Sequence, residues 1–185
     1  MPRIGFPLSQ FIIVTGLPAS GKSTLGRAVA AALALPMLDK DEILEALFEN
    51  RGIGDAEWRR KLSRLADEEL RTKAFQLKGA VLSSWWRHPL SHVESGTPVD
   101  WLASLPGKLI ELHCLCSPRI AAERFLARRR HEGHLDRDKS SSEVLASFEE
   151  QSLLGPLRIG RLVQACTESQ LDLSAIVREI GLTNG

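Results

Sequence analysis

Residues 11–33, FIIVTGLPASGKSTLGRAVAAAL, constrain the fold more than any other part of the chain. Phe11–Val14 form an apolar, branched run with the length of a buried parallel strand, and this run breaks at Gly16. After the glycine-containing segment that follows, apolar residues recur at helical spacing over Leu25–Leu33. The stretch therefore predicts a buried strand, a tight turn and a helix in immediate succession.

The turn carries a motif that binds phosphate. Gly16 to Ser23 fit G-x-x-x-x-G-K-[ST] between a strand and a helix, and the alternative is an ordinary glycine-rich turn. Glycines let backbone N–H groups turn inward around an anion, at the positive end of the helix dipole. Lys22 is expected to reach the β- and γ-phosphates, and the Ser23 hydroxyl to ligate Mg²⁺. The sequence thus predicts a nucleoside triphosphate site, whose candidate residues are Gly16, Pro18, Ala19, Ser20, Gly21, Lys22, Ser23 and Thr24.

Length and charge narrow the class of protein. A chain of 185 residues, 43% hydrophobic, can bury one core, so residues 1–185 are predicted to form a single domain. Lys and Arg number 24 against 23 Asp and Glu, and this balance gives no reason to expect a nucleic-acid partner or an anionic membrane. Neither a secretory signal nor a membrane-spanning run is recognisable, so the cytoplasm is the expected location.

Two aspartates follow the second predicted strand, which ends at Leu38. Ligands of open α/β sheets bind beyond the carboxyl ends of the strands, so Asp39 and Asp41 should lie beside the phosphate loop. One carboxylate could hold the water shell of Mg²⁺, and the other could accept the proton of an attacking hydroxyl. The alternative is that one of them caps the helix that follows. Both roles are compatible when they fall on different carboxylates.

The third apolar run ends in hydroxyls instead of a carboxylate. Many P-loop enzymes carry an aspartate there, which orients the magnesium water, but this chain has Ser83 and Ser84. The magnesium role therefore shifts to Asp39. Trp85 and Trp86 follow at the edge where ligands bind. They either form a stacking wall for a ring, or one packs in the core while the other covers a helix.

The fourth predicted strand spans Lys108–Cys116 and contains Glu111 and His113. Because these two residues lie along the strand, and not at its end, we interpret them as packing or hydrogen-bonding residues. A fifth strand is predicted over Arg161–Cys166, after a helix that begins at Ser140.

An arginine-rich segment follows the fourth strand. A helix is predicted over Arg119–Arg130, in which Arg124 and Arg128 share one face. Together with the polar segment after it, this pattern indicates a lid with cations at its root, which closes over phosphates and excludes water. The alternative is that these arginines only interact with the negative, C-terminal end of the helix dipole. A metal site formed by His131, His134 and Asp136 is disfavoured, because no cysteine or further histidine is near.

These segments resemble a known family, the small P-loop kinases of metabolites. The group includes gluconate and shikimate kinases, chloramphenicol phosphotransferase and zeta-toxin-like, AAA-type ATP-binding proteins. The matching pieces are GLPASGKST, LDKDEI, CSPRIAAERFLARRR, and HEGHLD with the later helix ending FEEQSLLGPL. The resemblance implies a nucleoside-monophosphate-kinase-like α/β fold, in which helices flank a five-stranded parallel sheet. It also implies a mobile lid at about 129–140, an acceptor-side helical region at about 41–78, and ATP with Mg²⁺ as the donor pair.

The resemblance also assigns roles to individual residues. Asp39 resembles the magnesium-side carboxylate and Asp41 the carboxylate that contacts the acceptor hydroxyl. Arg124 or Arg128 resembles the catalytic lid arginine, with Arg129 and Arg130 as further candidates. The chain departs from the family at Leu44, where phosphotransferases carry a basic residue, and at Leu135, where sugar kinases carry phenylalanine.

The sequence therefore predicts an ATP-dependent phosphotransferase that acts on a hydroxyl of a small metabolite or antibiotic. Two other functions remain open: a kinase of nucleotides or nucleic-acid ends, and a regulatory protein that hydrolyses ATP slowly. A base-sized acceptor pocket would favour the first of these, and ATP binding without acceptor-dependent turnover would favour the second.

Overall fold

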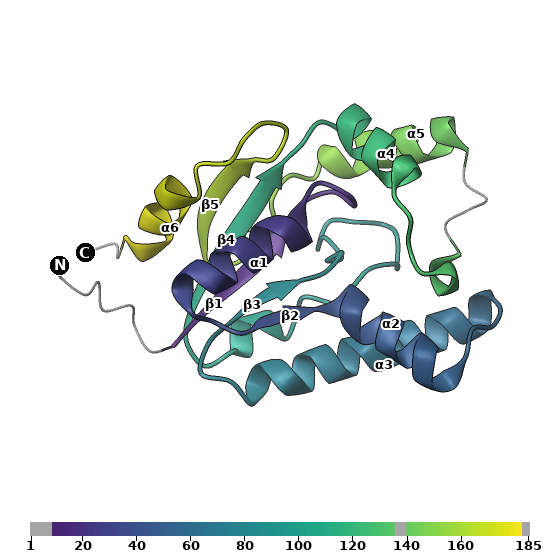
Figure 1. The fold of residues 1–185 in the computed structure, drawn as a ribbon, viewed down its shortest axis with the longest axis horizontal. Coiled ribbons are helices and arrows are strands. Elements are labelled where there is room, and N and C mark those ends of the chain that lie inside the picture. The colour runs from purple at the N-terminus through teal and green to yellow at the C-terminus, as the bar shows by residue number, and fades with distance from the viewer. Residues whose placement is uncertain (1–8, 136–139, 183–185) are drawn as a thin grey trace.

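Five parallel strands form one sheet at the centre of the molecule (Figure 1). The structure is a computed structural model and describes residues 9–135 and 140–182. The strands are β1 (Gln10–Thr15), β2 (Met37–Asp39), β3 (Ala80–Ser83), β4 (Lys108–Leu115) and β5 (Arg161–Cys166). Their order is β2-β3-β1-β4-β5, so β1, which leads into the phosphate loop, lies in the middle of the sheet. This arrangement confirms the predicted P-loop α/β fold.

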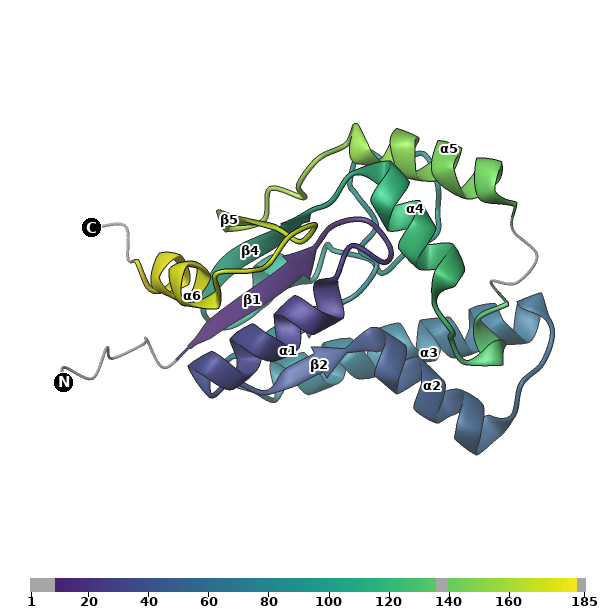
Figure 2. The ribbon, with the colours of Figure 1, turned by 45° about the horizontal axis from the view of Figure 1, so that its top comes forward.

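Helices cover both faces of the sheet. Figure 2 shows α1 and α6 side by side across one face, while α2 and α3 pack together beyond β2. No helix in the described parts of the chain is long and apolar enough to cross a bilayer. The helices are α1 (Lys22–Leu33), α2 (Lys40–Arg51), α3 (Ala56–Phe75), α4 (Pro118–Ala127), α5 (Ser141–Ser152) and α6 (Leu173–Gly181), with short 3₁₀ turns η1 (Leu102–Ser104) and η2 (Glu132–His134).

Successive side chains of β1 point to opposite faces of the sheet and belong to two separate apolar cores. Phe11 and Ile13 point to the face covered by α3, whereas Ile12 and Val14 point to the face covered by α1 and α6. All four side chains are fully buried. Each burial of this kind contributes roughly 1.5–3 kcal/mol, so β1 is anchored on both sides just before the phosphate loop begins.

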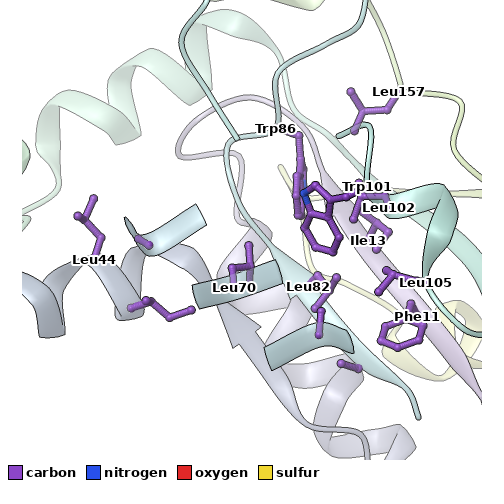
Figure 3. Close-up of a cluster of buried hydrophobic side chains, with 14 of the residues drawn as sticks. Phe11, Ile13, Leu44, Leu70, Leu82, Trp86, Trp101, Leu102, Leu105 and Leu157 are labelled. Carbon is purple, nitrogen blue, oxygen red and sulfur yellow. The ribbon is translucent and has the colours of Figure 1, made fainter. Parts of the chain in front are cut away.

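The two adjacent tryptophans have different environments. Trp86 lies in the α3-side core beside Trp101 (Figure 3), and its Nε1 donates a hydrogen bond to the Val14 carbonyl oxygen at 2.9 Å. Trp85 is 42% exposed, and its Nε1 donates to Gln151 Oε1 on α5 at 3.1 Å. One tryptophan is therefore a core residue, and the other contacts a neighbouring helix.

The predicted helix over Arg119–Arg130 is wrong in its C-terminal part. Helix α4 ends at Ala127, and Arg128 follows with an extended backbone of φ −74° and ψ 143°. Arg124 and Arg128 therefore do not share a helical face. Beyond the end of α4, Arg128 packs back on the Phe125 ring and Arg130 forms an ion pair with Asp41 on α2. Residues 136–139 of the predicted lid, including the candidate ligand Asp136, lie outside the described residues.

Candidate active site

The loop between β1 and α1 depends on two glycines. Gly16 has a φ of 129°, and a Cβ atom there would lie 2.8 Å from the carbonyl oxygen of Cys114 on β4. Gly21 has a φ of 91° at the N-cap of α1. Residues other than glycine rarely adopt either backbone conformation. Both positions therefore require glycine for the loop to turn tightly over the sheet edge.

The start of α1 is left ready for an anion. Its N-cap makes no side-chain hydrogen bond, and its first turn contains no acidic residue. The starts of α2, α3, α5 and α6 are capped by the side chains of Asp39, Asp55, Ser140 and Asp172. Helix α4 also lacks a side-chain cap, but its first turn contains Pro118, which has no N–H group to offer. The first N–H groups of a helix need an acceptor, and phosphate oxygens supply one along the dipole axis. The uncapped helix start thus fits a nucleotide phosphate.

Lys22 lies over this loop in a buried position. Its side chain is 8% exposed, and Nζ donates to the carbonyl oxygens of Gly16 at 3.0 Å and Leu17 at 2.6 Å. Burial lowers the pKa of Lys22 to about 8, and the charge of Arg128 acts in the same direction. Burial disfavours the ammonium group more than the carboxylates of Asp41 and Asp39 favour it, and a bound phosphate would add further stabilisation of the charged form.

Ser23 and Asp39 meet at the position predicted for magnesium. The Ser23 hydroxyl donates to Asp39 Oδ2 at 2.5 Å, and Asp39 is only 4% exposed. Asp39 Oδ1 also accepts from the backbone N–H of Asp41 at 3.0 Å, so Asp39 caps α2 as well. Burial raises the pKa of Asp39, while the Ser23 hydrogen bond acts in the opposite direction. A hydroxyl and a carboxylate oxygen side by side fit Mg²⁺, which prefers few protein ligands together with phosphate and water.

Asp41 forms an ion pair with an arginine at the root of the predicted lid. Its Oδ2 lies 2.5 Å from Arg130 NH2, and about half of the Asp41 side chain is exposed. Burial alone would raise the pKa of Asp41, but the positive charges around it, Arg130 first, outweigh this effect and lower it. Asp41 is thus an ionised carboxylate close to Lys22, whose charge also acts on it.

Residues next to Arg130 rest on helix α2. His134 is buried and its Nε2 lies 3.0 Å from Glu45 Oε1, while His131 stacks on Phe48 with ring centroids 5.3 Å apart. Gly133 lies so close to this ring that an added Cβ would be 2.6 Å from a Phe48 carbon. The two histidines therefore have partners on α2. Across residues 9–135 and 140–182, no three histidine, cysteine or acidic side chains cluster as metal ligands.

The candidate arginines point to two different places. Arg124 donates to the Thr167 carbonyl oxygen at 3.0 Å and joins α4 to the chain after β5. Arg128 lies with its guanidinium carbon 4.6 Å from the Phe125 ring centroid, and its charge acts on both Lys22 and Asp41. Arg128 and Arg130 are thus the arginines next to the charged groups of the site. The sequence left the choice among them open because it could not show where α4 ends.

Known proteins resemble this chain in sequence and in fold. The family model AAA_33, described as an AAA domain, matches residues 11–151. The chain belongs to this AAA domain family. A solved structure from Chloroflexus aurantiacus, provisionally described as a kinase, is 29% identical with a TM-score of 0.76, over 96% of this chain and 100% of that one.

Two shikimate kinases are also similar to this AAA-domain protein. The enzyme from Bacteroides thetaiotaomicron has the same fold, with a TM-score of 0.53 and 19% identity over 92% of this chain and 95% of that one. The enzyme from Corynebacterium glutamicum is 45% identical over 38 residues, 20% of this chain and 22% of that enzyme's length. The fold and family are therefore those of P-loop, nucleotide-binding, kinase-like proteins.

A cavity of about 280 Å³ adjoins the phosphate loop of the AAA domain. Its lining residues fall within 15–17, 85–95, 113–116 and 147–157, and include the exposed Trp85. None of its lining residues comes from 41–78, the predicted acceptor-side helical region. From its place along the strand, His113 was expected to have only a packing or hydrogen-bonding role. His113 is hydrogen-bonded as predicted, but it also lines this cavity.

Proposed function

We propose that this AAA-domain protein is an ATP-dependent kinase that transfers the γ-phosphate to a hydroxyl of a small molecule. One observation carries the proposal: the Ser23–Asp39 hydrogen bond and the ionised Asp41 lie beside buried Lys22 at the uncapped start of α1. Phosphoryl transfer needs groups that hold the metal ion, bind the phosphates and accept the proton of the incoming hydroxyl. These residues would provide all three.

Each of these residues would have a separate role in the reaction. The first turn of α1 and Lys22 would hold the β- and γ-phosphates in line with the acceptor. Ser23 and Asp39 would hold Mg²⁺, which supplies charge neutralisation on the phosphates when bound. Asp41 would accept the hydroxyl proton as the new oxygen–phosphorus bond forms and the bond to the ADP oxygen breaks. Arg128 and Arg130 would stabilise the charge on the transferred group, and Arg124 would position α4.

The end of β3 supports transfer to a hydroxyl over hydrolysis. Ser83 is buried, and the Ser84 hydroxyl is paired with the Thr97 hydroxyl at 2.5 Å. Neither side chain is a carboxylate, so this strand offers no base for an attacking water. The acidic residues lie instead at the end of β2, beside the loop that would hold the γ-phosphate.

The test is ADP release with Mg²⁺ across sugars, sugar acids, alicyclic and aromatic alcohols, antibiotics and nucleosides. We expect one class to accelerate release in the wild type, and the acceleration to be lost in both Lys22→Ala and Asp41→Asn. Lys73→Ala on the surface of α3 is the matched control and should keep full activity. ATP binding with no response to any acceptor would reject the kinase and favour the slow regulatory ATPase.

A nucleotide kinase is the second candidate, because exposed Trp85 forms part of the cavity wall and could stack on a base. In the same assay, acceleration by nucleosides or nucleotides alone would favour it.

A further inference from the structure

The cavity beside the phosphate loop has mainly apolar walls. They include the side chains of Leu17, Trp85, Val93, Leu115, Leu154 and Leu157. Histidines apart, its described lining carries two formal charges, Arg87 and Glu150, which are of opposite sign. A strongly anionic molecule would meet one carboxylate and one arginine here, without the surplus of cations that offsets its desolvation, whereas an apolar body gains from burial against the apolar side chains. A volume of about 280 Å³ is at the small end of ligand sites.

A buried chain of hydrogen bonds leads from the core to this cavity. Glu111 is fully buried, and its carboxylate accepts from the backbone N–H groups of Leu157, Arg158 and Ile159. It also accepts from the Thr15 hydroxyl at 2.8 Å. Because that hydroxyl has a single proton and gives it to Glu111, Thr15 must be the acceptor toward His113 Nδ1, which lies 2.8 Å away.

This chain fixes the tautomer of His113. Nδ1 carries the proton, and burial lowers the pKa of His113, with the nearby Lys22 charge acting in the same direction against the opposing effect of Glu111. The ring is therefore neutral, and its Nε2 has a free lone pair. Among the described residues, none forms a hydrogen bond with Nε2, and the residue lines the cavity. Nε2 is thus the ring nitrogen left for a ligand that donates a hydrogen bond.

The other two histidines of the cavity do not combine a fixed ring with an available ring nitrogen. His88 uses both ring nitrogens: Nε2 donates to the Pro156 carbonyl oxygen at 3.2 Å and Nδ1 accepts from the Leu90 N–H at 3.1 Å. His92 is exposed, and within residues 9–135 and 140–182 no hydrogen bond or ring contact holds its ring. Among the described histidines that line the cavity, His113 alone has a ring orientation and tautomer set by the fold together with one ring nitrogen that is available to a ligand.

We propose that the cavity binds the phosphate acceptor, and that this acceptor is an uncharged, largely apolar alcohol with an aromatic or alicyclic body. A second hydrogen-bond donor on that body binds His113 Nε2. The reacting hydroxyl lies toward Gly16 and Leu17, which line the cavity and whose carbonyl oxygens accept from Lys22. His113 is then the residue that selects and orients the acceptor. This inference rests on the proposed kinase function, because it names the molecule that receives the phosphate.

The experiment uses two probes that differ in one hydroxyl, 4-(2-hydroxyethyl)phenol and 2-phenylethanol, with gluconate as the polar competitor. Dissociation constants are measured by ligand-observed NMR on the full chain with Mg²⁺ and a non-hydrolysable ATP analogue. We expect the wild type to bind the phenol about tenfold more tightly than 2-phenylethanol, because one hydrogen bond to His113 is added. The ratio should fall to about one in His113→Phe.

Two further variants make the result specific. His113→Gln offers an amide oxygen in place of Nε2 and should restore part of the preference, while Lys73→Ala on the surface of α3 should leave the tenfold ratio intact. Thermal unfolding and binding of the ATP analogue, measured on each variant, show whether the fold and the phosphate site are unchanged. If His113→Phe does not fold, the result for His113→Gln decides.

The outcomes separate this inference from the kinase proposal. Failure of both alcohols to bind, tighter binding of gluconate, or an unchanged ratio in His113→Phe would overturn the assignment of the cavity. Phosphate transfer to sugar acids in the same case would leave the kinase proposal standing. His113-dependent binding of the phenol without any acceptor-stimulated ADP release would uphold the cavity as a binding site and reject the kinase.

Discussion

The phosphate side and the cavity side of the site are built in opposite ways. On the phosphate side, the buried Lys22 ammonium group donates to two backbone carbonyl oxygens and α1 starts without a side-chain cap, so the polar groups there are left for a ligand. On the cavity side, Glu111 receives four hydrogen bonds from the protein, and Thr15 and His113 are bonded to each other. The hydrogen bonds of the cavity side are thus completed by the fold, whereas the phosphate side leaves the start of α1 for a ligand.

This contrast predicts opposite consequences for stability and function. Changes on the phosphate side should remove activity at little or no cost in stability, because they relieve burial of charge. Changes in the hydrogen-bonded support of the cavity should destabilise the protein, because they leave donors without acceptors.

Lys22→Met is the strongest test of the phosphate side. We expect kcat/KM to fall about 10³-fold, roughly 4 kcal/mol of transition-state stabilisation, because a charge that acts on the transferred phosphate is lost. The thermal midpoint of the ATP-free protein should stay the same or rise, since a buried ammonium group with a lowered pKa is removed. Steady-state kinetics and calorimetry measure the two effects. A large loss of stability would contradict the contrast, and Lys73→Met on α3 is the control.

Glu111→Gln is the matching test of the cavity side. The amide NH₂ would face protein N–H groups that now donate to a carboxylate, so we expect the free energy of unfolding to fall by about 3 kcal/mol. Urea denaturation measures this change, with exposed Glu149→Gln on α5 as the control. Affinity for ATP should be unaffected in the variant while it remains folded. A stability equal to that of the wild type would show that the cavity is not supported by this carboxylate.

The two halves also differ in how far the sequence could predict them. The phosphate loop was predictable because its residues are contiguous, and one motif specifies them. The contact between Ser23 and Asp39 followed from a general rule, since carboxyl ends of parallel strands meet at one edge of the sheet. Sequence order alone therefore predicted that Ser23 and Asp39 lie close together.

The cavity side was not predictable in the same way. The role of His113 depends on the register that places it opposite Thr15 on β1, and nothing in the sequence sets that register visibly. One contact of the phosphate side was equally hidden. Arg130 reaches Asp41 because α4 stops at Ala127, whereas the arginine run itself favours continuation of the helix. Long-range contacts of this kind require the assembled fold.

Asp39→Asn tests a smaller effect on the phosphate side. The amide oxygen can still cap α2, but the charge that would hold Mg²⁺ is lost, so the Mg²⁺ concentration for half-maximal activity should rise at least tenfold. Stability should change little, because burial already disfavours the ionised form. Activity titrated with Mg²⁺ measures the shift, and exposed Glu42→Gln serves as the control. An unchanged Mg²⁺ requirement would remove Asp39 from the metal site.

The smallest predicted effect is a pH dependence that belongs to the phosphate side alone. The pKa of Lys22 is lowered from 10.5 to about 8 in the ATP-free protein, so the ammonium group loses its proton as the pH rises through 8. Phosphate binding needs the protonated form, and the dissociation constant for ATP should therefore rise about tenfold between pH 7 and pH 9. The unfolded chain binds the proton more tightly, so the same group makes the ATP-free protein more stable with rising pH between about 8 and 10.5. Calorimetric titration across this range tests both signs. Lys22→Arg keeps its charge and should show a flat ATP profile, whereas binding of 4-(2-hydroxyethyl)phenol in the cavity should not follow the pKa of Lys22. If ATP affinity is constant to pH 9 in the wild type, the buried lysine is not the group that receives the phosphate.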